Sequence, residues 1–301
     1  MTLPRIHPLT THMKRPEMFF KNQATISSRN IVHGLLLFGT LMLLPCLAEI
    51  SVAEAIPTSG KDSTPLPSHQ AHWDYMGIDG PEHWGMLDAG YMACEKGREQ
   101  SPIDVKTSQD SQTQSPLVFH YQSSPVHVVN NSHTVQVNYK AGSMVLFNGQ
   151  EYELRQFHFH DPSEHHIDGK SYPIEMHLVH QSPSGHLLVI GVLVQSGEQN
   201  PILDQAGKWI EQKLGHRIPM EGEDIRSGVV LNVTDLLPKD TNHFYSYHGS
   251  LTTPPCSEGV QWIILKEHIE VSERQVQRFI RTFGPNARPI QLPSGRLIEA
   301  R

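Results

Sequence analysis

The chain has 301 residues, a length that allows one large domain or two of ordinary size. Its 24 basic and 31 acidic side chains give a net charge of −7, which leaves little positive charge to neutralise phosphates and argues against nucleic-acid binding. The 22 glycines, 22 prolines and 18% charged residues are typical of a loop-rich globular protein and argue against a coiled coil. The 20 histidines favour metal or proton-transfer chemistry, because imidazole binds metals and titrates near neutral pH.

The N-terminal segment, residues 1–55, has the order of a secretory signal peptide: basic, then apolar, then small. Five basic residues precede residue 31, an apolar run covers Ile31–Leu47, and Ala53-Glu54-Ala55 fits a cleavage site. We therefore expect export to a periplasm or the extracellular space. The alternative is an uncleaved membrane anchor, since the run is almost long enough to span a bilayer. Residues 56–70, rich in Pro and Ser, are expected to form a linker.

Export changes the expectation for the cysteines. Cys46 would leave with the signal peptide, and Cys94 and Cys256 would remain. Two cysteines in an oxidising compartment are expected to form one disulfide, whose long loop contributes about 4–5 kcal/mol in the chain-entropy model. The alternative is a pair of buried free thiols.

The remaining chain, residues 71–301, contains many short strand-like runs separated by turn signals. The runs are Leu117–Tyr121, Val126–Val129, Thr134–Tyr139, Ser143–Phe147, Glu151–His160, Ile174–His180, Leu187–Val194, Phe244–Tyr247 and Val260–Leu265. Asn148-Gly149, between two of these runs, is a strong hairpin signal.

Only two segments have a helical pattern. They are Ile202–Leu214 and Glu273–Phe283, and Ser272 and Gln275 suit a capping box at the start of the second. The pattern predicts a β-rich α+β fold: a single domain around a large, mostly antiparallel, twisted central sheet with a few short peripheral helices.

Three histidines lie where a metal site would need them. Side chains alternate along a strand, so His158 and His160 share one face of their predicted strand, opposite Phe157. If the strand containing Glu175 and His177 pairs beside it, His177 supplies a third nitrogen. Three neutral imidazoles and a water make a catalytic zinc site with an open position. The alternative is that these are hydrogen-bonded core histidines.

Further motifs accompany the segments 156–160 and 175–180. They are His72-Trp73-Asp74-Tyr75, Gly80-Pro81-Glu82-His83-Trp84, Gln100-Ser101-Pro102-Ile103, Ser163-Glu164-His165 and Gly249-Ser250-Leu251-Thr252-Thr253-Pro254-Pro255. Taken in chain order, the seven motifs resemble the α-class carbonic anhydrase family, of the secreted or periplasmic type, over about residues 72–289. Each motif is short, but together they are very specific. Cys94 and Cys256 also resemble the two positions that secreted members join.

The resemblance implies a zinc ion on His158, His160 and His177, with hydroxide as the fourth ligand. Thr252 matches the residue that accepts the hydroxide's hydrogen and passes its own proton to Glu164, which orients the nucleophile. Without the resemblance, Thr252 would be a turn residue and Glu164 a solvated carboxylate.

The resemblance also assigns residues around the ion. Gln156 and Glu175 would fix the rings of the zinc ligands, although cross-strand pairing alone would also explain them. The predicted wall of the carbon dioxide pocket consists of Val179, Val189, Leu251, Thr253 and Trp262, which in strands are more often ordinary core residues.

Release of the product proton needs a mobile group with a pKa near 7. His133 occupies the position of the family's proton shuttle; the alternative is an exposed histidine at a strand end. Tyr75, Asn131 and Gln136 match the positions that order the water chain, and Gln136 is a departure because Asn is common there. His165, His166, His180 and His248 are expected to be structural or solvated.

The function implied is zinc-dependent, reversible hydration of carbon dioxide to bicarbonate and a proton, with weak ester hydrolysis as a side activity. One alternative is an acatalytic carbonic-anhydrase-like binding domain, but such domains usually lack a zinc histidine. A zinc protease is disfavoured because there is no HExxH helix. The predicted partners are the small-molecule substrate and product; no specific protein partner is predicted, and a homodimer is left open.

Overall fold

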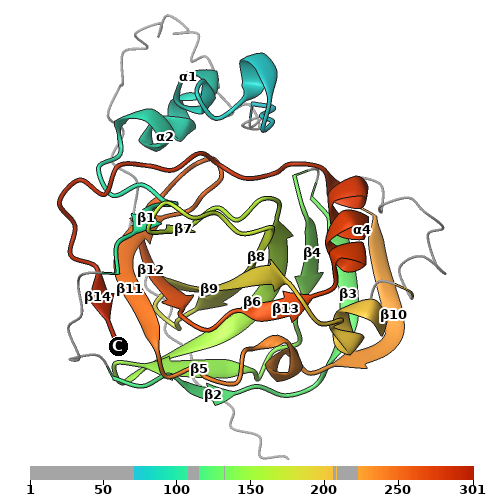
Figure 1. The fold of residues 1–301 in the computed structure, drawn as a ribbon. Coiled ribbons are helices and arrows are strands. Elements are labelled where there is room, and N and C mark those ends of the chain that lie inside the picture. Colours follow the sequence, from blue (N-terminus) through green and yellow to red (C-terminus); the bar gives the residue numbers. More distant parts are fainter. Residues whose placement is uncertain (1–70, 108–114, 132, 206–207, 209–222) are drawn as a thin grey trace, which may run out of the picture. The chain divides into compact units, whose positions relative to one another are not determined.

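The computed structural model describes residues 71–107, 115–131, 133–205, 208 and 223–301, all within one compact unit that spans Thr64–Arg301. The predicted signal segment and linker, residues 1–70, lie outside the described residues, as does Cys46. In the described part, one sheet has 12 strands and a second has two (Figure 1). Within these ranges no helix is both long and apolar enough to cross a membrane.

In the part of the chain that the structure describes, four short helical segments precede the first strand, and another lies between two later strands. A longer helix comes just before the last strand. The helices whose bounds lie wholly within the described residues are η1 (Gly77–Asp79), α1 (Trp84–Leu87), η2 (Ala89–Tyr91), α2 (Ala93–Lys96), η3 (Val233–Leu236) and α4 (Glu273–Phe283). The first seven strands are β1 (Asp104–Val105), β2 (Val118–His120), β3 (Ser124–Asn130), β4 (Val135–Asn138), β5 (Met144–Phe147), β6 (Gln150–His160) and β7 (His166–Ile167). The others are β8 (Ile174–Gln181), β9 (Leu187–Ser196), β10 (Asp224–Leu231), β11 (Phe244–Ser250), β12 (Glu258–Leu265), β13 (Ile269–Val271) and β14 (Glu299–Ala300).

The large sheet has the strand order β10-β3-β4-β6-β8-β9-β12-β11-β14, with β5 also paired to β6, β2 to β5 and β13 to β9. Only the pairings of β9 with β12 and with β13 are parallel among the described strands of this sheet. The fold is therefore β-rich with a mostly antiparallel central sheet and short helices, as predicted. The strands that contain the candidate ligands, β6 and β8, lie side by side at its centre (Figure 1).

Two local predictions are confirmed in detail. Asn148 and Gly149 have positive φ angles of 49° and 77° and join β5 to β6 as a tight hairpin. Helix α4 begins after Ser272, which forms the predicted capping box with Gln275. Of the other expected helix, residues 201–205 and 208 are helical, and the rest lies outside the described residues.

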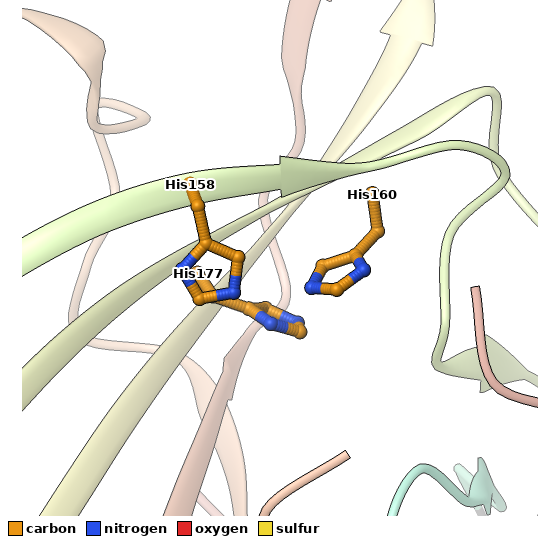
Figure 2. Close-up of side chains that lie close together, drawn as sticks. All are labelled: His158, His160 and His177. Atoms are coloured by element: carbon orange, nitrogen blue, oxygen red, sulfur yellow. The ribbon is translucent and has the colours of Figure 1, made fainter. Parts of the chain in front are cut away.

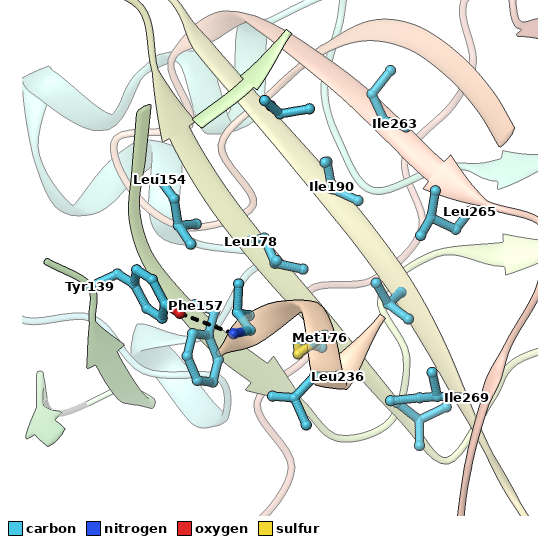
Figure 3. Close-up of a cluster of buried hydrophobic side chains, with 14 of the residues drawn as sticks. Tyr139, Leu154, Phe157, Met176, Leu178, Ile190, Leu236, Ile263, Leu265 and Ile269 are labelled. Atoms are coloured by element: carbon cyan, nitrogen blue, oxygen red, sulfur yellow. Dashed lines mark hydrogen bonds between the residues drawn. The ribbon is translucent and has the colours of Figure 1, made fainter. Parts of the chain in front are cut away.

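The two faces of the sheet bury different side chains. Phe157 on β6 and Leu178 on β8 belong to the larger hydrophobic cluster, together with residues of β9, β12 and η3 (Figure 3). Phe159 packs on Phe279 of α4, with ring centroids 5.6 Å apart. Because side chains alternate along β6, burying these phenylalanines on one face directs His158 and His160 to the other.

Candidate metal centre and active site

The pairing of β6 with β8 brings the three predicted ligands together. His158 lies directly opposite His177, and His160 lies opposite Glu175. One nitrogen from each of His158, His160 and His177 lies within 4.8 Å of the other two, and the three rings converge from two neighbouring strands (Figure 2). A single metal ion can bind three nitrogens at such separations, since zinc–nitrogen bonds are about 2.0–2.1 Å long.

A hydrogen bond to a fixed acceptor determines the tautomer of each ring. His158 donates from Nδ1 to Oε1 of Gln156 at 2.8 Å, and His160 donates from Nδ1 to the carbonyl of Asn286 at 2.7 Å. His177 donates from Nε2 to Oε1 of Glu175, also at 2.8 Å. The nitrogens left with a lone pair are Nε2 of His158, Nε2 of His160 and Nδ1 of His177. Such outer partners are what orient metal-binding histidines.

Burial keeps these imidazoles neutral, which is the form that binds a metal. It lowers the pKa of His160 to about 4, although the bond to the Asn286 carbonyl opposes this shift. Burial also lowers the pKa of His158, with the neighbouring histidines adding to the effect. The pKa of His177 is lowered by burial too, against the attraction of Glu175.

Unpaired polar atoms gather at the same place. Among the described residues, only four buried side-chain atoms lack a hydrogen-bond partner, and three of them are His160 Nε2, Glu164 Oε2 and Tyr75 Oη. Glu164 Oε2 lies 3.6 Å from His160 Nε2 and 3.9 Å from His177 Nδ1. Leaving such atoms unpaired is costly, so the proximity of His160 Nε2 and Glu164 Oε2 fits a site built to hold an ion and its ligands.

Glu164 is held rigidly beside the histidines. Its Oε1 accepts the backbone N–H of Arg288 at 2.9 Å, and its side chain is fully buried. Burial raises the pKa of Glu164 to about 7, while His177, the Arg288 N–H group and the Thr252 side chain favour the carboxylate. A cation on the three histidines would favour it further, because opposite charge stabilises the ionised form. Thr252 itself is buried, with 6% of its surface exposed.

A chain of directed hydrogen bonds lies behind Glu175. His165 donates from Nδ1 to Glu175 Oε1 and from its backbone N–H to Oε2, both at 2.8 Å. The other ring nitrogen of His165 therefore accepts from Tyr247 Oη at 2.7 Å, and Tyr247 Oη lies 2.8 Å from Ser101 Oγ. Burial opposes ionisation of Glu175, but the attraction and hydrogen bonds of His165 and His177 outweigh it and hold its pKa well below the usual range. The site is thus supported by a hydrogen-bonded chain of His165, Glu175 and His177. The ring and carboxylate atoms that these residues turn toward one another are already paired.

The predicted pocket residues form a row across neighbouring strands. Val179 pairs with Val189, and Val189 pairs with Trp262. Val189 and Trp262 belong to the second hydrophobic cluster, and Val179 and Leu251 pack against it. The carbonyl of Thr253 accepts the backbone N–H of Cys256 at 2.8 Å and so shapes the loop after β11.

The predicted proton-shuttle residue, His133, stacks on Trp73, with ring centroids 3.4 Å apart and planes at 13°. Asn131 Oδ1 accepts the backbone N–H groups of His133 and Thr134 and so forms the turn before β4. Gln136 donates to Asn138 through its side chain. Of the three residues expected to order water, only Tyr75 has a buried side-chain polar atom, its hydroxyl, without a hydrogen-bond partner in the described part of the chain.

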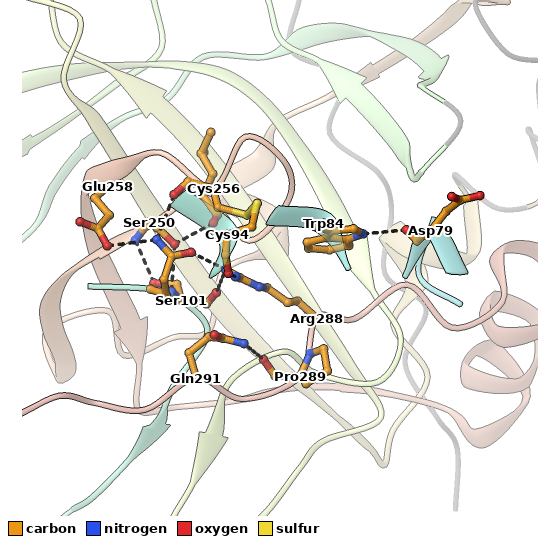
Figure 4. The surroundings of a disulfide bond; sticks show 12 residues. Asp79, Trp84, Cys94, Ser101, Ser250, Cys256, Glu258, Arg288, Pro289 and Gln291 are labelled. Atoms are coloured by element: carbon orange, nitrogen blue, oxygen red, sulfur yellow. Dashed lines mark hydrogen bonds between the residues drawn. A yellow bond between two sulfur atoms is a disulfide. The ribbon is translucent and has the colours of Figure 1, made fainter. Parts of the chain in front are cut away.

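A disulfide ties the loop that carries Thr252 to α2, and a buried arginine binds the backbone at Cys94 on the other side of that disulfide. Cys94 of α2 is bonded to Cys256, as predicted, across a sequence separation of 162 (Figure 4). The guanidinium of Arg288 donates to the carbonyls of Cys94 and Ser101 and to Oε1 of Gln100, at 2.8–2.9 Å. This network joins segments distant in sequence on one side of the candidate centre.

The sequence of this chain matches a known protein family and several of its members. Residues 79–300 match the family described as eukaryotic-type carbonic anhydrase, so the chain belongs to that family. It is 42% identical over 242 residues to a carbonic anhydrase of Nostoc sp., covering 78% of this chain and 88% of the relative. It is also 35% identical over 221 residues to dioscorin dioA3 of Dioscorea japonica, covering 71% of this chain and 79% of the relative.

A solved structure agrees. The α-carbonic anhydrase of Thermovibrio ammonificans, in complex with the inhibitor sulfanilamide, has a TM-score of 0.71 and 39% sequence identity, covering 76% of this chain and 99% of that one. These similarities confirm the predicted family and enzyme class, a carbonic anhydrase.

Four residues that support the site were not predicted from the sequence to do so. Asn286, Arg288 and Tyr247 have no local motif that suggests their contacts, and His165 was expected only to be structural or solvated. Their partners are 10 to 194 residues away in the chain. The family resemblance, which extends to Pro289, was the one sequence signal that reached Asn286 and Arg288.

Proposed function

We propose that the protein catalyses the reversible hydration of carbon dioxide with a zinc ion held by His158, His160 and His177. The observation that carries the proposal is the set of three converging imidazoles, two buried and one half-buried, each of which donates from its other ring nitrogen to a fixed acceptor. When bound by three neutral ligands, zinc supplies Lewis-acid activation of water near neutral pH.

The protein side chains then orient the reactants. Thr252 accepts a hydrogen bond from the attacking water and donates a hydrogen bond from its own hydroxyl to Glu164, which points the nucleophile's lone pair toward the carbon of carbon dioxide. The unpaired Oε2 of Glu164 supports this role, because it is buried and free to accept. Val179, Val189, Leu251, Thr253 and Trp262 provide the pocket for the apolar substrate.

His133 is proposed to carry the product proton away from the centre. Its ring is only partly buried and rests on Trp73, and the turn formed by Asn131 fixes its backbone. Imidazole is the side-chain group that most often exchanges protons with buffer near neutral pH. Tyr75, Asn131 and Gln136 are proposed to order the intervening water.

Stopped-flow measurement of carbon dioxide hydration by the zinc-loaded full chain tests the proposal. We expect rapid hydration that is lost in His177→Ala. His133→Ala should lower kcat while changing kcat/KM little, and imidazole buffer should restore kcat. Absence of hydration by the zinc-loaded wild type would overturn the proposal in favour of an acatalytic binding domain.

Two further proposals concern activity and location. An activated water can attack other carbonyls, so weak hydrolysis of an ester such as p-nitrophenyl acetate is expected, with the same dependence on His177. The leader, residues 1–55, is proposed to direct export to a periplasm or the extracellular space, or to anchor the protein if uncleaved; N-terminal sequencing of the protein recovered from each cell fraction distinguishes these outcomes.

A further inference from the structure

Asn286 connects three parts of the candidate site through its side chain. It follows α4 and is buried, with 3% of its surface exposed. Its Oδ1 accepts the backbone N–H of Asp161 at 2.8 Å, and its Nδ2 donates to the carbonyl of Phe159 at 3.0 Å. A longer contact of 3.5 Å joins Nδ2 to the carbonyl of His133.

These contacts surround a proposed zinc ligand on both sides. Phe159 and Asp161 are the neighbours of His160, so the Asn286 amide is hydrogen-bonded to the backbone immediately before and after that residue. A backbone bond from Asn286 N–H to the Asp161 carbonyl, at 2.9 Å, completes a paired bridge at the end of β6. The backbone of His160 is therefore held by one side chain from a distant part of the chain.

The same amide also contacts the turn that carries His133. Thr134 in this turn donates from Oγ1 to the Phe159 carbonyl at 3.0 Å, so Phe159 accepts from both the turn and Asn286. An asparagine suits this position because its short side chain offers two donors and an acceptor. Aspartate would place a second acceptor against two carbonyls, and alanine would remove the acceptor of the Asp161 N–H and one of the donors to the Phe159 carbonyl.

We propose that the Asn286 side chain is a positioning residue that couples the His160 end of β6 to the His133 turn, so that metal retention and proton transfer depend on one amide. This inference rests on the proposed function and extends it, because the side chain touches neither the substrate nor the metal position. Asn286→Ala and Asn286→Asp retain the backbone carbonyl that accepts from His160 Nδ1, and so they isolate the contribution of the amide.

The test compares these two variants with wild type and with Asn200→Ala in the full chain. Asn200 is a matched control because its Oδ1, like that of Asn286, accepts backbone N–H groups, here those of Ile202 and Leu203. We expect zinc loss to a chelator to be roughly 10- to 100-fold faster in both Asn286 variants, the range typical of outer-shell changes. In the metal-free protein, hydrogen exchange of the peptide spanning 130–136 should also be faster.

The kinetics separate positioning from simple destabilisation. Per bound zinc, kcat should fall more than kcat/KM in the Asn286 variants, and imidazole should recover part of kcat. Asn200→Ala should lower the melting temperature without these changes. If the Asn286 variants behave like Asn200→Ala, with unchanged zinc loss, hydrogen exchange and kcat, the inference is wrong. If wild type itself binds no zinc and hydrates no carbon dioxide, the proposed function fails, and hydrogen exchange still decides whether the amide holds the His133 turn.

Discussion

Gly191 leaves the space that the carboxylate of Glu175 occupies: a Cβ at position 191 would lie 2.8 Å from Oε1 of Glu175. Gly191 on β9 is also the direct strand partner of His177 on β8. The same Cβ would lie 2.8 Å from Cδ1 of Ile264 on the next strand, β12. The absent side chain therefore allows the hydrogen bond between Glu175 and His177 to form within a closely packed sheet.

We predict that Gly191→Ala displaces Glu175 and weakens zinc binding by roughly 10- to 100-fold, because the orienting bond to His177 is lost. A competitive chelator titration measures the change. Gly228→Ala is the matched control, since a Cβ at this strand position would meet nothing within 4 Å. Equal zinc affinity in wild type and Gly191→Ala would show that Glu175 adapts without losing its bond.

Tyr247→Phe tests the hydrogen-bond chain behind the centre. Removing the hydroxyl leaves Nε2 of buried His165 without its donor, and we expect the free energy of unfolding to fall by about 1–3 kcal/mol. Urea unfolding measures this loss. Tyr172→Phe is the control, because Tyr172 belongs to the same hydrophobic cluster and its hydroxyl has no hydrogen bond among the described residues. A loss no larger than in the control would contradict the prediction.

His180 makes stability depend on pH. Its ring is buried between the Tyr121 hydroxyl and the Leu188 carbonyl, at 2.6 and 3.2 Å, and burial lowers its pKa from 6.5 to about 4. Between these values the unfolded chain binds a proton that the folded protein does not, so stability falls as pH falls from 6.5 toward 4. The full loss from this group is up to about 3 kcal/mol.

The His180→Gln variant lacks this pH-dependent contribution to the free energy of unfolding. We expect the stability advantage of wild type over the variant to be largest above pH 7 and to shrink as pH falls toward 4.5, in urea unfolding at a series of pH values. Parallel curves for the two proteins across this range would show that His180 is not the group responsible.

The disulfide should stabilise the domain as well as hold the Thr252 loop. We predict that Cys94→Ser/Cys256→Ser lowers the free energy of unfolding by about 2–5 kcal/mol, the range typical of a native disulfide in a secreted domain. Thermal and urea unfolding of both proteins measure the difference. A reductant should lower wild-type stability similarly and leave the double variant unchanged; the same stability in wild type and variant would contradict the prediction.

The sequence by itself determined the strands, turns and helix ends whose residue patterns lie within a few neighbouring residues. Alternation in Gln156-Phe157-His158-Phe159-His160 was sufficient to place two histidines on one strand face, and the confirmed pairing with β8 added His177. The capping box at Ser272 and the Asn148-Gly149 turn are equally local. Strand β10, by contrast, was not predicted, because Asp224–Leu231 has too little alternation of apolar and polar residues to stand out.

Tertiary structure alone decided which acceptor holds the His160 ring. His160 donates to a carbonyl 126 residues away, Arg288 contacts Cys94 across 194 residues, and Gly191 is required only because β9 lies beside β8. Such contacts depend on the register of strands and on how loops pack over them, which no periodicity within one segment encodes. The chain's local pattern thus placed two histidines on a common face, and long-range packing set the acceptor of His160 and the surroundings that suit the three rings to a metal.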